Sequence, residues 1–318
     1  MKLIYHPIFL EHDTGMHPEN ANRLLSLDSL PETEVPSGEE FLTLVHRPAH
    51  IAEVKTACQF SDMLDPDTIT SPGSYQAAIH AVGAAILASE SGDFALVRPP
   101  GHHSYPDRST GFCLFNNVAI AAQKLVLEGK RVLILDFDGH LGDGTSHIFE
   151  KTDEVLYWSL HQFPAFPGMG WVDEIGSEKG KGFTVNVPLP PGSGDDIFIH
   201  SLQSTMPIAE QFEPDVVAIS AGFDAHELDP LLQLRVTNNS FYKIGAMLRR
   251  RFSNIFAVLE GGYNTQELPG CIYNFVAGIN GEEMPYKQPH TESSRMIWEE
   301  YDLRISEVER VLKPFWKF

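Results

Sequence analysis

The chain has 318 residues, of which 42% are hydrophobic and 10% aromatic, which is enough for a large packed core. Its 23 Lys and Arg against 43 Asp and Glu give a formal net charge of -20, which repels phosphate backbones and anionic lipid. We therefore expect neither nucleic-acid nor membrane binding.

Cysteine usage and the first residues predict a cytoplasmic protein. The three cysteines (58, 113 and 271) form no close pair, which argues against a disulfide framework. The opening MKLIYHPIFLEHD lacks the apolar length and small-residue cleavage site of a secretory signal. No apolar stretch approaches the roughly 18 residues that a membrane span needs.

Short apolar runs alternate with helical patterns along the chain. Each run is continuous rather than alternating with polar residues, which is typical of strands buried on both faces. In chain order the expected elements are helix 73–90, strand 94–97, helix 116–129, strands 132–135, 155–158 and 216–219, helix 239–252, strand 255–259 and a C-terminal helical pattern over 291–312. This alternation predicts an α/β fold with a parallel sheet and helices on both faces.

Polar motifs follow directly after the five predicted strands. They are RPPGHH, DFDGH, SLHQ, SAGFDAH and EGGYN. Because ligands bind outside the carboxyl ends of parallel strands, we expect the five motifs to converge on one crevice.

Asp138, His140 and Asp224 are candidate ligands of a divalent metal. Asp138 and His140 are two residues apart after a strand, so an extended backbone points both side chains the same way. Two carboxylates and one imidazole leave positions open for water and substrate, as in catalytic rather than structural zinc sites. The alternative is that Asp138 pairs with a lysine and His140 is an ordinary core histidine.

His102 and His103 are candidates for acid–base chemistry beside that metal. Each needs an acidic neighbour, and Asp136 and Asp143 are available. The alternative is a turn carrying two solvated histidines. Tyr263, after Gly261 and Gly262, could donate a hydrogen bond to a carbonyl oxygen, although a tyrosine after two glycines is more often structural.

Taken together, these motifs make the sequence similar to the zinc-dependent histone deacetylase family, which includes bacterial acetylpolyamine and acetoin-utilisation relatives. Matching segments run in order over about residues 12–275, from HDTGMHPENANRL through LDPDTITSPGSYQAA, GFCLFNNVAIAA, SLHQFPAFPG and VNVPLPPG to LEGGYN. The resemblance implies an arginase/deacetylase fold: a single domain over 1–318 with a parallel sheet of about eight strands and a helical extension at 276–318.

The resemblance assigns one Zn²⁺ per chain, or Fe²⁺ in its place, to Asp138, His140 and Asp224. Many family members have a second histidine after the first, where this chain has Leu141. Since Leu141 cannot bind a metal, the departure makes the assignment to His140 less ambiguous.

The resemblance also assigns catalytic roles. His103 is implied to be the general base for the attacking water and the acid for the leaving amine. His102 would give electrostatic support, with Asp143 holding His103 and Asp136 holding His102. Tyr263 is implied to polarise the acyl carbonyl.

Two K⁺ sites are further implications of the resemblance. The first would use Asp136, Asp138, His140, Ser159 and Leu160. The second would use main-chain carbonyls near Phe149, Thr152, Val155 and Phe183. A bound monovalent ion would help to neutralise acids that the zinc does not contact.

The family pattern places Phe112 and Phe166 as the walls of a substrate tunnel, with Gly111 beside them and Arg23 near its inner end. Leu231 stands where polyamine-deacetylating relatives can carry an acidic residue and acetyl-lysine enzymes carry leucine. It therefore favours acetyl-lysine as substrate.

Four functional interpretations follow. The favoured one is removal of an acetyl or short acyl group from a primary amine, most simply the side chain of acetyl-lysine. Acids in the 61–72 loop keep an acetylpolyamine or another small amide open as substrate; they are Asp62, Asp65 and Asp67. The others are an arginase-type ureohydrolase with two manganese ions and a catalytically silent acyl-lysine binder. The C-terminal helical pattern could pack on the body of the domain or on a second subunit, so a homo-oligomer is compatible with each.

Overall fold

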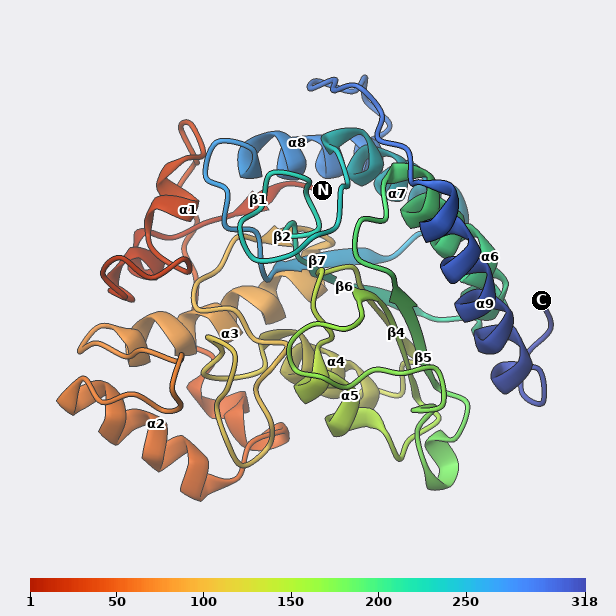
Figure 1. Cartoon of the computed structure of the whole chain (residues 1–318). Coiled ribbons are helices and arrows are strands. Elements are labelled where there is room, and N and C mark those ends of the chain that lie inside the picture. The colour runs from red at the N-terminus through yellow and green to blue at the C-terminus, as the bar shows by residue number, and fades with distance from the viewer.

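The computed structural model describes all residues, 1–318, as one α/β domain around a parallel seven-stranded sheet (Figure 1). The strand order is β1-β2-β7-β6-β3-β4-β5, and every neighbouring pair is parallel. The predicted fold class is confirmed, with seven strands against the expected eight or so.

The five predicted strands are all present, and two more complete the sheet. Their bounds are β1 Leu3–Ile4, β2 Phe94–Ala95, β3 Val132–Asp136, β4 Val155–Gln162, β5 Thr184–Leu189, β6 Val216–Ala221 and β7 Ile255–Leu259. β2 is shorter than expected and β4 longer. The unpredicted β5 lies at the sheet edge, and its sequence TVNVPL alternates with polar residues, so it does not form the continuous apolar run of a central strand.

The predicted helices are present, with ends shifted by a few residues. The helices are α1 Asn22–Leu25, α2 Pro48–Phe60, α3 Ser74–Ser91, α4 Asn117–Leu127, α5 Asp143–Phe149, α6 Asp195–Phe212, α7 Asn238–Arg251, α8 Leu268–Asn280 and α9 Arg295–Leu312. Short 3₁₀ helices occur at Pro7–Glu11, Glu39–Leu44 and Glu178–Gly180. No helix combines the length and hydropathy needed to cross a membrane.

The helices form layers on the two faces of the sheet (Figure 1). α3 and α4 cover one face, while α6, α7 and α8 lie on the other, and α9 runs beside α6 and edge strand β5. The alanine-rich α3 is almost wholly buried, which explains its long apolar pattern. The side chain of Asn116 caps α4 by accepting a hydrogen bond from the N–H of Ala119 at 3.1 Å.

The chain order creates a switch point between β3 and β6. From the central β3 the chain moves outward through β4 and β5, then returns to form β6 on the other side of β3 and β7 beyond it. Ligand sites in open parallel sheets lie at such points, outside the carboxyl ends of the strands. The loops after β3 and β6 therefore flank the expected crevice.

Candidate active site

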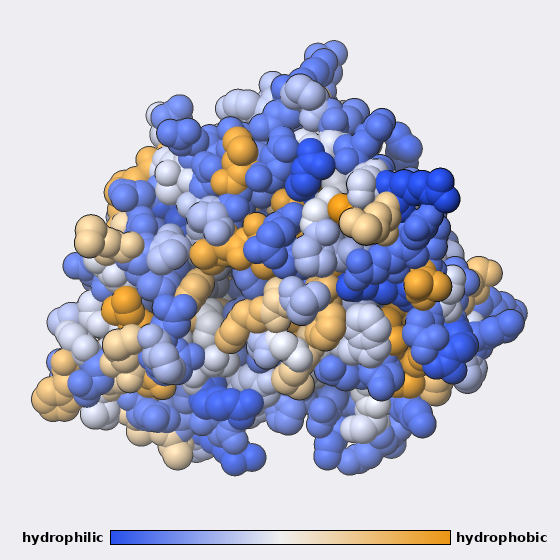
Figure 2. Space-filling view, in the orientation of Figure 1, coloured by the Kyte–Doolittle hydropathy of each residue, from blue (hydrophilic) through white to orange (hydrophobic).

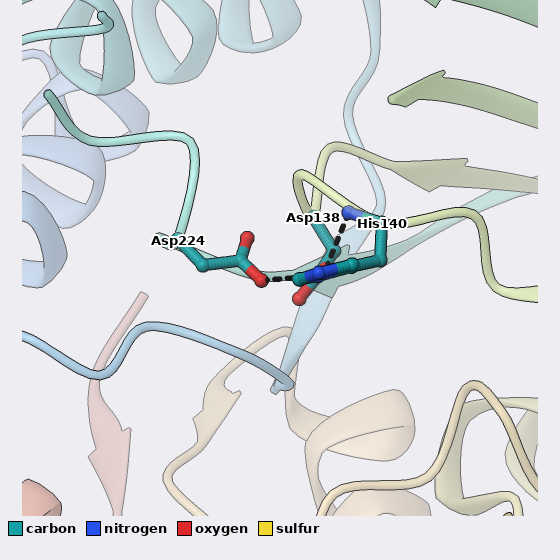
Figure 3. Close-up of side chains that lie close together, drawn as sticks. All are labelled: Asp138, His140 and Asp224. Atoms are coloured by element: carbon teal, nitrogen blue, oxygen red, sulfur yellow. Dashed lines mark hydrogen bonds and ion pairs between the residues drawn. The ribbon is translucent and has the colours of Figure 1, made fainter. Parts of the chain in front are cut away.

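Asp138, His140 and Asp224 come together at this switch point (Figure 3). One potential ligand atom from each lies within 4.8 Å of the others, and all three residues are buried. Nδ1 of His140 lies 2.7 Å from Oδ2 of Asp224 and 3.3 Å from Oδ1 of Asp138. The three side chains thus point toward a common centre from the two loops.

Backbone packing fixes the two aspartates. The N–H of Gly261 donates to Oδ2 of Asp138 at 2.8 Å, and the N–H of Gly139 donates to Oδ1 of Asp224 at 2.6 Å. A Cβ added to Gly222 would lie 2.0 Å from Oδ2 of Asp138. Only glycine therefore lets this backbone approach the carboxylate.

The donor set fits a divalent cation such as zinc. Neither Asp138 nor Asp224 contacts a lysine or arginine, so two buried carboxylates are balanced only by nearby histidines. Burial alone would lower the pKa of His140, but the carboxylates of Asp224 and Asp138 raise it to about 10. A proton on His140 thus supplies the positive charge that a metal would bring, and two oxygens and one nitrogen are ligands that zinc accepts.

Each histidine of the RPPGHH loop is bound to its own aspartate, as predicted. Nδ1 of His103 lies 2.7 Å from Oδ1 of Asp143, and Nδ1 of His102 lies 3.0 Å from Oδ2 of Asp136. The centroids of the two rings are 4.1 Å apart. In both rings Nδ1 is thus occupied by a carboxylate.

Tyr105 and Tyr157, which the sequence analysis missed, each donate a hydrogen bond to one of these aspartates. The Tyr105 hydroxyl donates to Oδ2 of Asp143 at 2.9 Å, and the Tyr157 hydroxyl donates to Oδ2 of Asp136 at 3.0 Å. Tyr157 lies inside a predicted strand, where the sequence alone cannot distinguish a hydrogen-bonding tyrosine from an aromatic residue of the core. Its role depends on contacts across the sheet.

The two histidines differ in basicity. Burial, with the neighbouring His102, lowers the pKa of His103 to about 4, even though Asp143 opposes this effect. Burial also lowers the pKa of His102, but Asp138 and Asp136 outweigh it and hold that pKa well above its usual value. A cation at Asp138 would cancel part of that carboxylate's effect. His103 is therefore the neutral member of the pair and the one suited to accept a proton.

Glu260 supports the histidine loop from beneath. Its Oε2 accepts hydrogen bonds from the N–H of Gly101 at 2.7 Å and from the N–H of His102 at 3.1 Å. Burial raises the pKa of Glu260 to about 7. Glu260 could have been predicted from the sequence, because it is an acid directly after a predicted buried strand, in the motif EGGYN. Asp136 was identified by the same pattern.

A cavity of about 220 Å³ opens above the metal candidates. Its lining residues are Asp65, Asp67, His103, Gly111, Phe112, His140, Phe166, Leu231 and Tyr263. The structure thus brings the predicted wall residues together with His103 and His140. Figure 2 shows apolar side chains gathered near the centre of a mostly hydrophilic face.

Of the three acids in the 61–72 loop, Asp65 and Asp67 line this cavity and Asp62 does not. Asp62 instead lines a shallow hollow beside α2. Oδ2 of Asp65 accepts a hydrogen bond from the N–H of Gly111 at 3.3 Å, which ties the acidic loop to the aromatic wall.

Tyr263 projects a hydroxyl that has no hydrogen-bond partner within the chain, while its ring packs at 5.7 Å from Phe112. Burial raises its pKa well above the usual value, so the phenol keeps its proton. Arg23 does not line the cavity: its guanidinium carbon lies 5.0 Å from the centre of the Tyr263 ring. Its Nε donates to the carbonyl of Gly262 at 2.7 Å, so it supports the tyrosine from behind.

Asp229 is a further residue that the sequence analysis missed. Its carboxylate accepts hydrogen bonds from the N–H of Tyr263 at 2.7 Å and of Leu231 at 3.0 Å. Burial, followed by the charge of Asp224, raises its pKa to about 7. One side chain thus joins the tyrosine loop to the loop that carries Leu231.

The residues expected to bind K⁺ cluster in two places. Asp136 and Ser159 face each other in register on β3 and β4, with Leu160 next in the strand. The other set lies at the end of α5 and the starts of β4 and β5: Phe149, Thr152, Val155 and Phe183. The carbonyl of Phe183 accepts a hydrogen bond from the N–H of Tyr157 at 2.9 Å.

Comparison with known proteins finds one matching family and several relatives. The family model described as "Histone deacetylase domain" matches residues 17–279. A probable deacetylase of Archaeoglobus fulgidus is 33% identical, over 99% of this chain and 98% of its own length. A probable deacetylase of Methanothermobacter thermautotrophicus is 39% identical over 89% of this chain and 92% of its own length.

A histone deacetylase-like amidohydrolase of Pseudomonas aeruginosa is 37% identical, over 83% of this chain and 73% of its own length. Among solved structures, one titled "Crystal Structure of HDA15 HD domain" superposes with a TM-score of 0.89 at 32% identity. The match covers 99% of this chain and 94% of that chain. The similarity therefore covers the whole fold.

Proposed function

Because the chain belongs to the histone deacetylase family, a family of deacetylating enzymes, we propose that it is a zinc-dependent hydrolase of acyl amides on primary amines. The favoured substrate is an acetyl-lysine side chain. One observation carries the proposal: a buried Asp–His–Asp cluster lies at the base of a cavity lined by a neutral histidine that is bound to its own aspartate.

Asp138, His140 and Asp224 would hold the zinc ion. When bound, zinc supplies Lewis-acid chemistry: it polarises a carbonyl oxygen and lowers the pKa of a coordinated water. Fe²⁺ accepts the same nitrogen and oxygen ligands.

The protein side chains supply the proton transfers. His103, neutral and oriented by Asp143, takes a proton from the attacking water and delivers it to the amine nitrogen as the C–N bond breaks, which releases acetate and the free amine. Tyr263 donates its hydroxyl proton in a hydrogen bond to the carbonyl oxygen as negative charge develops there. His102 and Asp136 lie beside the base and stabilise it electrostatically.

The cavity supports a linear acyl amine. Phe112 and Phe166 offer aromatic walls for an alkyl chain, and the partly buried Leu231 adds an apolar contact at the rim. Asp65 and Asp67 add negative charge there, which supports a substrate with a cationic flank and keeps acetylpolyamines as the second candidate. A screen of the zinc-loaded protein on acetyl-lysine peptides, acetylated polyamines and small aliphatic amides decides between them.

Two rival functions predict different results. An arginase-type enzyme needs two metal ions, and the chain groups one set of three ligands, so metal analysis should give about one zinc per chain rather than two. A silent acyl-lysine binder would bind the substrates without turnover. Tyr263→Phe should lower kcat about 100- to 1,000-fold with zinc retained, and unchanged kcat would contradict the oxyanion role.

We further propose two K⁺ sites, supported by the clustering of oxygen-bearing residues beside Ser159 and at the start of β4. Thermal unfolding in KCl against choline chloride tests them, because an ion bound only to the folded state raises Tm. A cytoplasmic, reducing compartment is proposed from the three buried, unpaired cysteines.

A further inference from the structure

Helix α9 lies outside the residues matched by the family model, yet one of its side chains binds the base of the loop that carries Phe166. Its buried face consists of Tyr301, Arg304, Ile305, Val308 and Leu312, which recur at helical spacing. That face packs on β5 and α6, as Figure 1 shows on the side of the molecule where the chain ends. Arg304 is the one charged residue on the buried face.

Arg304 is only 9% exposed, and both terminal nitrogens of its guanidinium donate hydrogen bonds. NH1 donates to the carbonyl of Phe163 at 2.7 Å and to that of Pro188 at 3.4 Å, and NH2 donates to Glu300. The guanidinium carbon lies 5.4 Å from the centre of the Trp171 ring. Burying a charge is costly unless it is paired and hydrogen-bonded, and here the partners are the Glu300 carboxylate and the main-chain carbonyls of Phe163 and Pro188.

Phe163 and Trp171 are the two ends of the loop that carries Phe166. Their rings pack on each other at 5.0 Å, so Arg304 holds both ends through one hydrogen bond and one cation–π contact. At the Trp171 end, Oε1 of Glu174 accepts hydrogen bonds from the N–H groups of Gly170 and Trp171 at 2.9 and 3.1 Å. The base of the loop is therefore fixed.

Phe166 itself is held by little else. Phe166 is 50% exposed, and its ring packs edge-on against His103 at 5.0 Å and against His140 at 6.5 Å. The position of this cavity wall thus depends on the base of its loop. Movement at the base would shift the wall relative to the catalytic histidine.

We infer that Arg304 is a positioning residue for substrate binding, which makes the C-terminal helix part of the substrate site through Phe166. This inference rests on the proposed function in so far as Phe166 contacts the substrate. Arg304 itself touches neither the cavity nor the catalytic side chains.

The test is a double-mutant cycle on the full-length, zinc-loaded protein. Arg304→Met keeps the aliphatic stem but removes the donors, Phe166→Ala removes the wall, and the third variant combines both. The readouts are KM and kcat for a fluorogenic acetyl-lysine amide, and the Kd of an alkyl hydroxamate of lysine-side-chain length. Arg310→Met is the matched control, because Arg310 is an exposed arginine of the same helix that pairs only with Glu307.

We expect Arg304→Met to raise KM and Kd about 3- to 10-fold with kcat changed less than about 2-fold, and to have almost no effect once Phe166 is alanine. Equal effects of Arg304→Met in both backgrounds, or an unchanged KM and Kd, would overturn the inference. If Arg304→Met does not fold, Arg304→Lys replaces it in the same double-mutant cycle. Lysine keeps the charge and one donor nitrogen, so the expected increase in KM and Kd is smaller. Failure of the wild-type protein to bind the hydroxamate would instead contradict the proposed function.

Discussion

The floor and the rim of the cavity are built in opposite ways. We call Asp138, His140, Asp224, His102 and His103 the floor, and Asp65, Asp67, Phe112, Phe166 and Leu231 the rim. Every floor side chain is buried and has a hydrogen-bond or ion-pair partner within the chain. The rim side chains are partly or largely exposed and lie on loops.

This difference suggests a division of roles: the floor residues would carry out the reaction, and the rim residues would select the substrate. The floor residues follow strands β3, β6 and the short β2, so the central sheet holds the groups that we propose to react. The rim residues lie on loops, where a substitution changes contacts without disturbing the core. We therefore expect changes to the floor to abolish turnover and changes to the rim to redirect it.

The largest expected effect comes from removing a floor carboxylate. Asp224→Ala deletes one of three metal ligands and leaves His140 with Asp138 alone. We expect bound zinc to fall below about 0.1 per chain and kcat/KM to fall at least about 1,000-fold, as measured by metal analysis and an acetyl-lysine assay.

Asp62→Ala is the control, because this loop acid lies off the cavity. It should retain full zinc content and activity. Asp224→Ala protein that still holds one zinc per chain would show that the cluster is not the metal site.

The next effect tests how the floor holds its base. Asp143→Asn can still accept a hydrogen bond from Nδ1 of His103 but removes the negative charge. Since that charge raises the pKa of His103, its loss makes the imidazole a weaker base. We expect kcat/KM to fall about 100-fold and the acid limb of the pH profile to move to lower pH.

Tyr105→Phe provides the comparison, because it removes the other hydrogen bond to Asp143 but keeps the charge. Its kcat/KM should fall only about 2- to 5-fold. Equal losses in the two variants would mean that hydrogen-bond geometry, and not charge, is what Asp143 contributes.

The sequence predicted the floor well because strand ends are readable. A continuous apolar run followed by Asp or His identifies a buried strand and the group at its carboxyl end, as for Asp138 and His140. The resemblance then added the pairings, and the structure brings together His103 with Asp143 and His102 with Asp136.

The supporting residues could not be predicted in the same way. Asp229 binds the N–H of Tyr263 from a position 34 residues earlier, and Arg304 reaches Phe163 across 141 residues. Such contacts depend on how loops and helices pack, and neither residue type nor spacing indicates them. β5 was missed for a related reason, since an edge strand need not be apolar on both faces.

A rim change should redirect rather than abolish turnover. Leu231→Glu adds a third acid beside Asp65 and Asp67 on the cavity lining. The added charge attracts a distal ammonium, so the ratio of kcat/KM for an acetylated polyamine to that for acetyl-lysine amide should rise about 10-fold. Competition assays at low and high salt measure this ratio.

Leu231→Gln separates charge from shape at this position. It should leave the ratio within about 2-fold of wild type, and the effect of the glutamate should shrink as salt rises. An equal change for both variants would show that side-chain size rather than charge selects the substrate.

The smallest expected effect is on stability, and it concerns His46, a histidine near the floor. His46 lies buried beneath it, with Nδ1 3.0 Å from the carbonyl of Tyr105 and Nε2 accepting the N–H of Asn116 at 2.9 Å. The bond at Nε2 requires the neutral ring, because a protonated ring has no nitrogen left to accept a hydrogen bond. Burial, with His50 nearby, accordingly lowers the pKa of His46 to about 3.

Because the unfolded histidine titrates near 6.5, between about pH 6.5 and 3 the unfolded chain holds a proton at this site that the folded chain lacks. His46 therefore opposes folding increasingly as pH falls, by about 1.4 kcal/mol per pH unit below about 6.5. His46→Gln removes this pH-dependent cost of folding. It should lower the free energy of unfolding at about pH 7 by about 1–2 kcal/mol through the lost hydrogen bonds.

The stability gap between wild type and His46→Gln should then change by about 2 kcal/mol between about pH 7 and pH 5, so that it closes or reverses sign. Urea unfolding of both proteins at several pH values measures the gap. The exposed His147, changed to Gln, is the control and should leave the pH dependence unaltered. A gap that stays constant with pH would mean that the folded protein accommodates a protonated His46, and that the layer beneath the floor is looser than the floor itself.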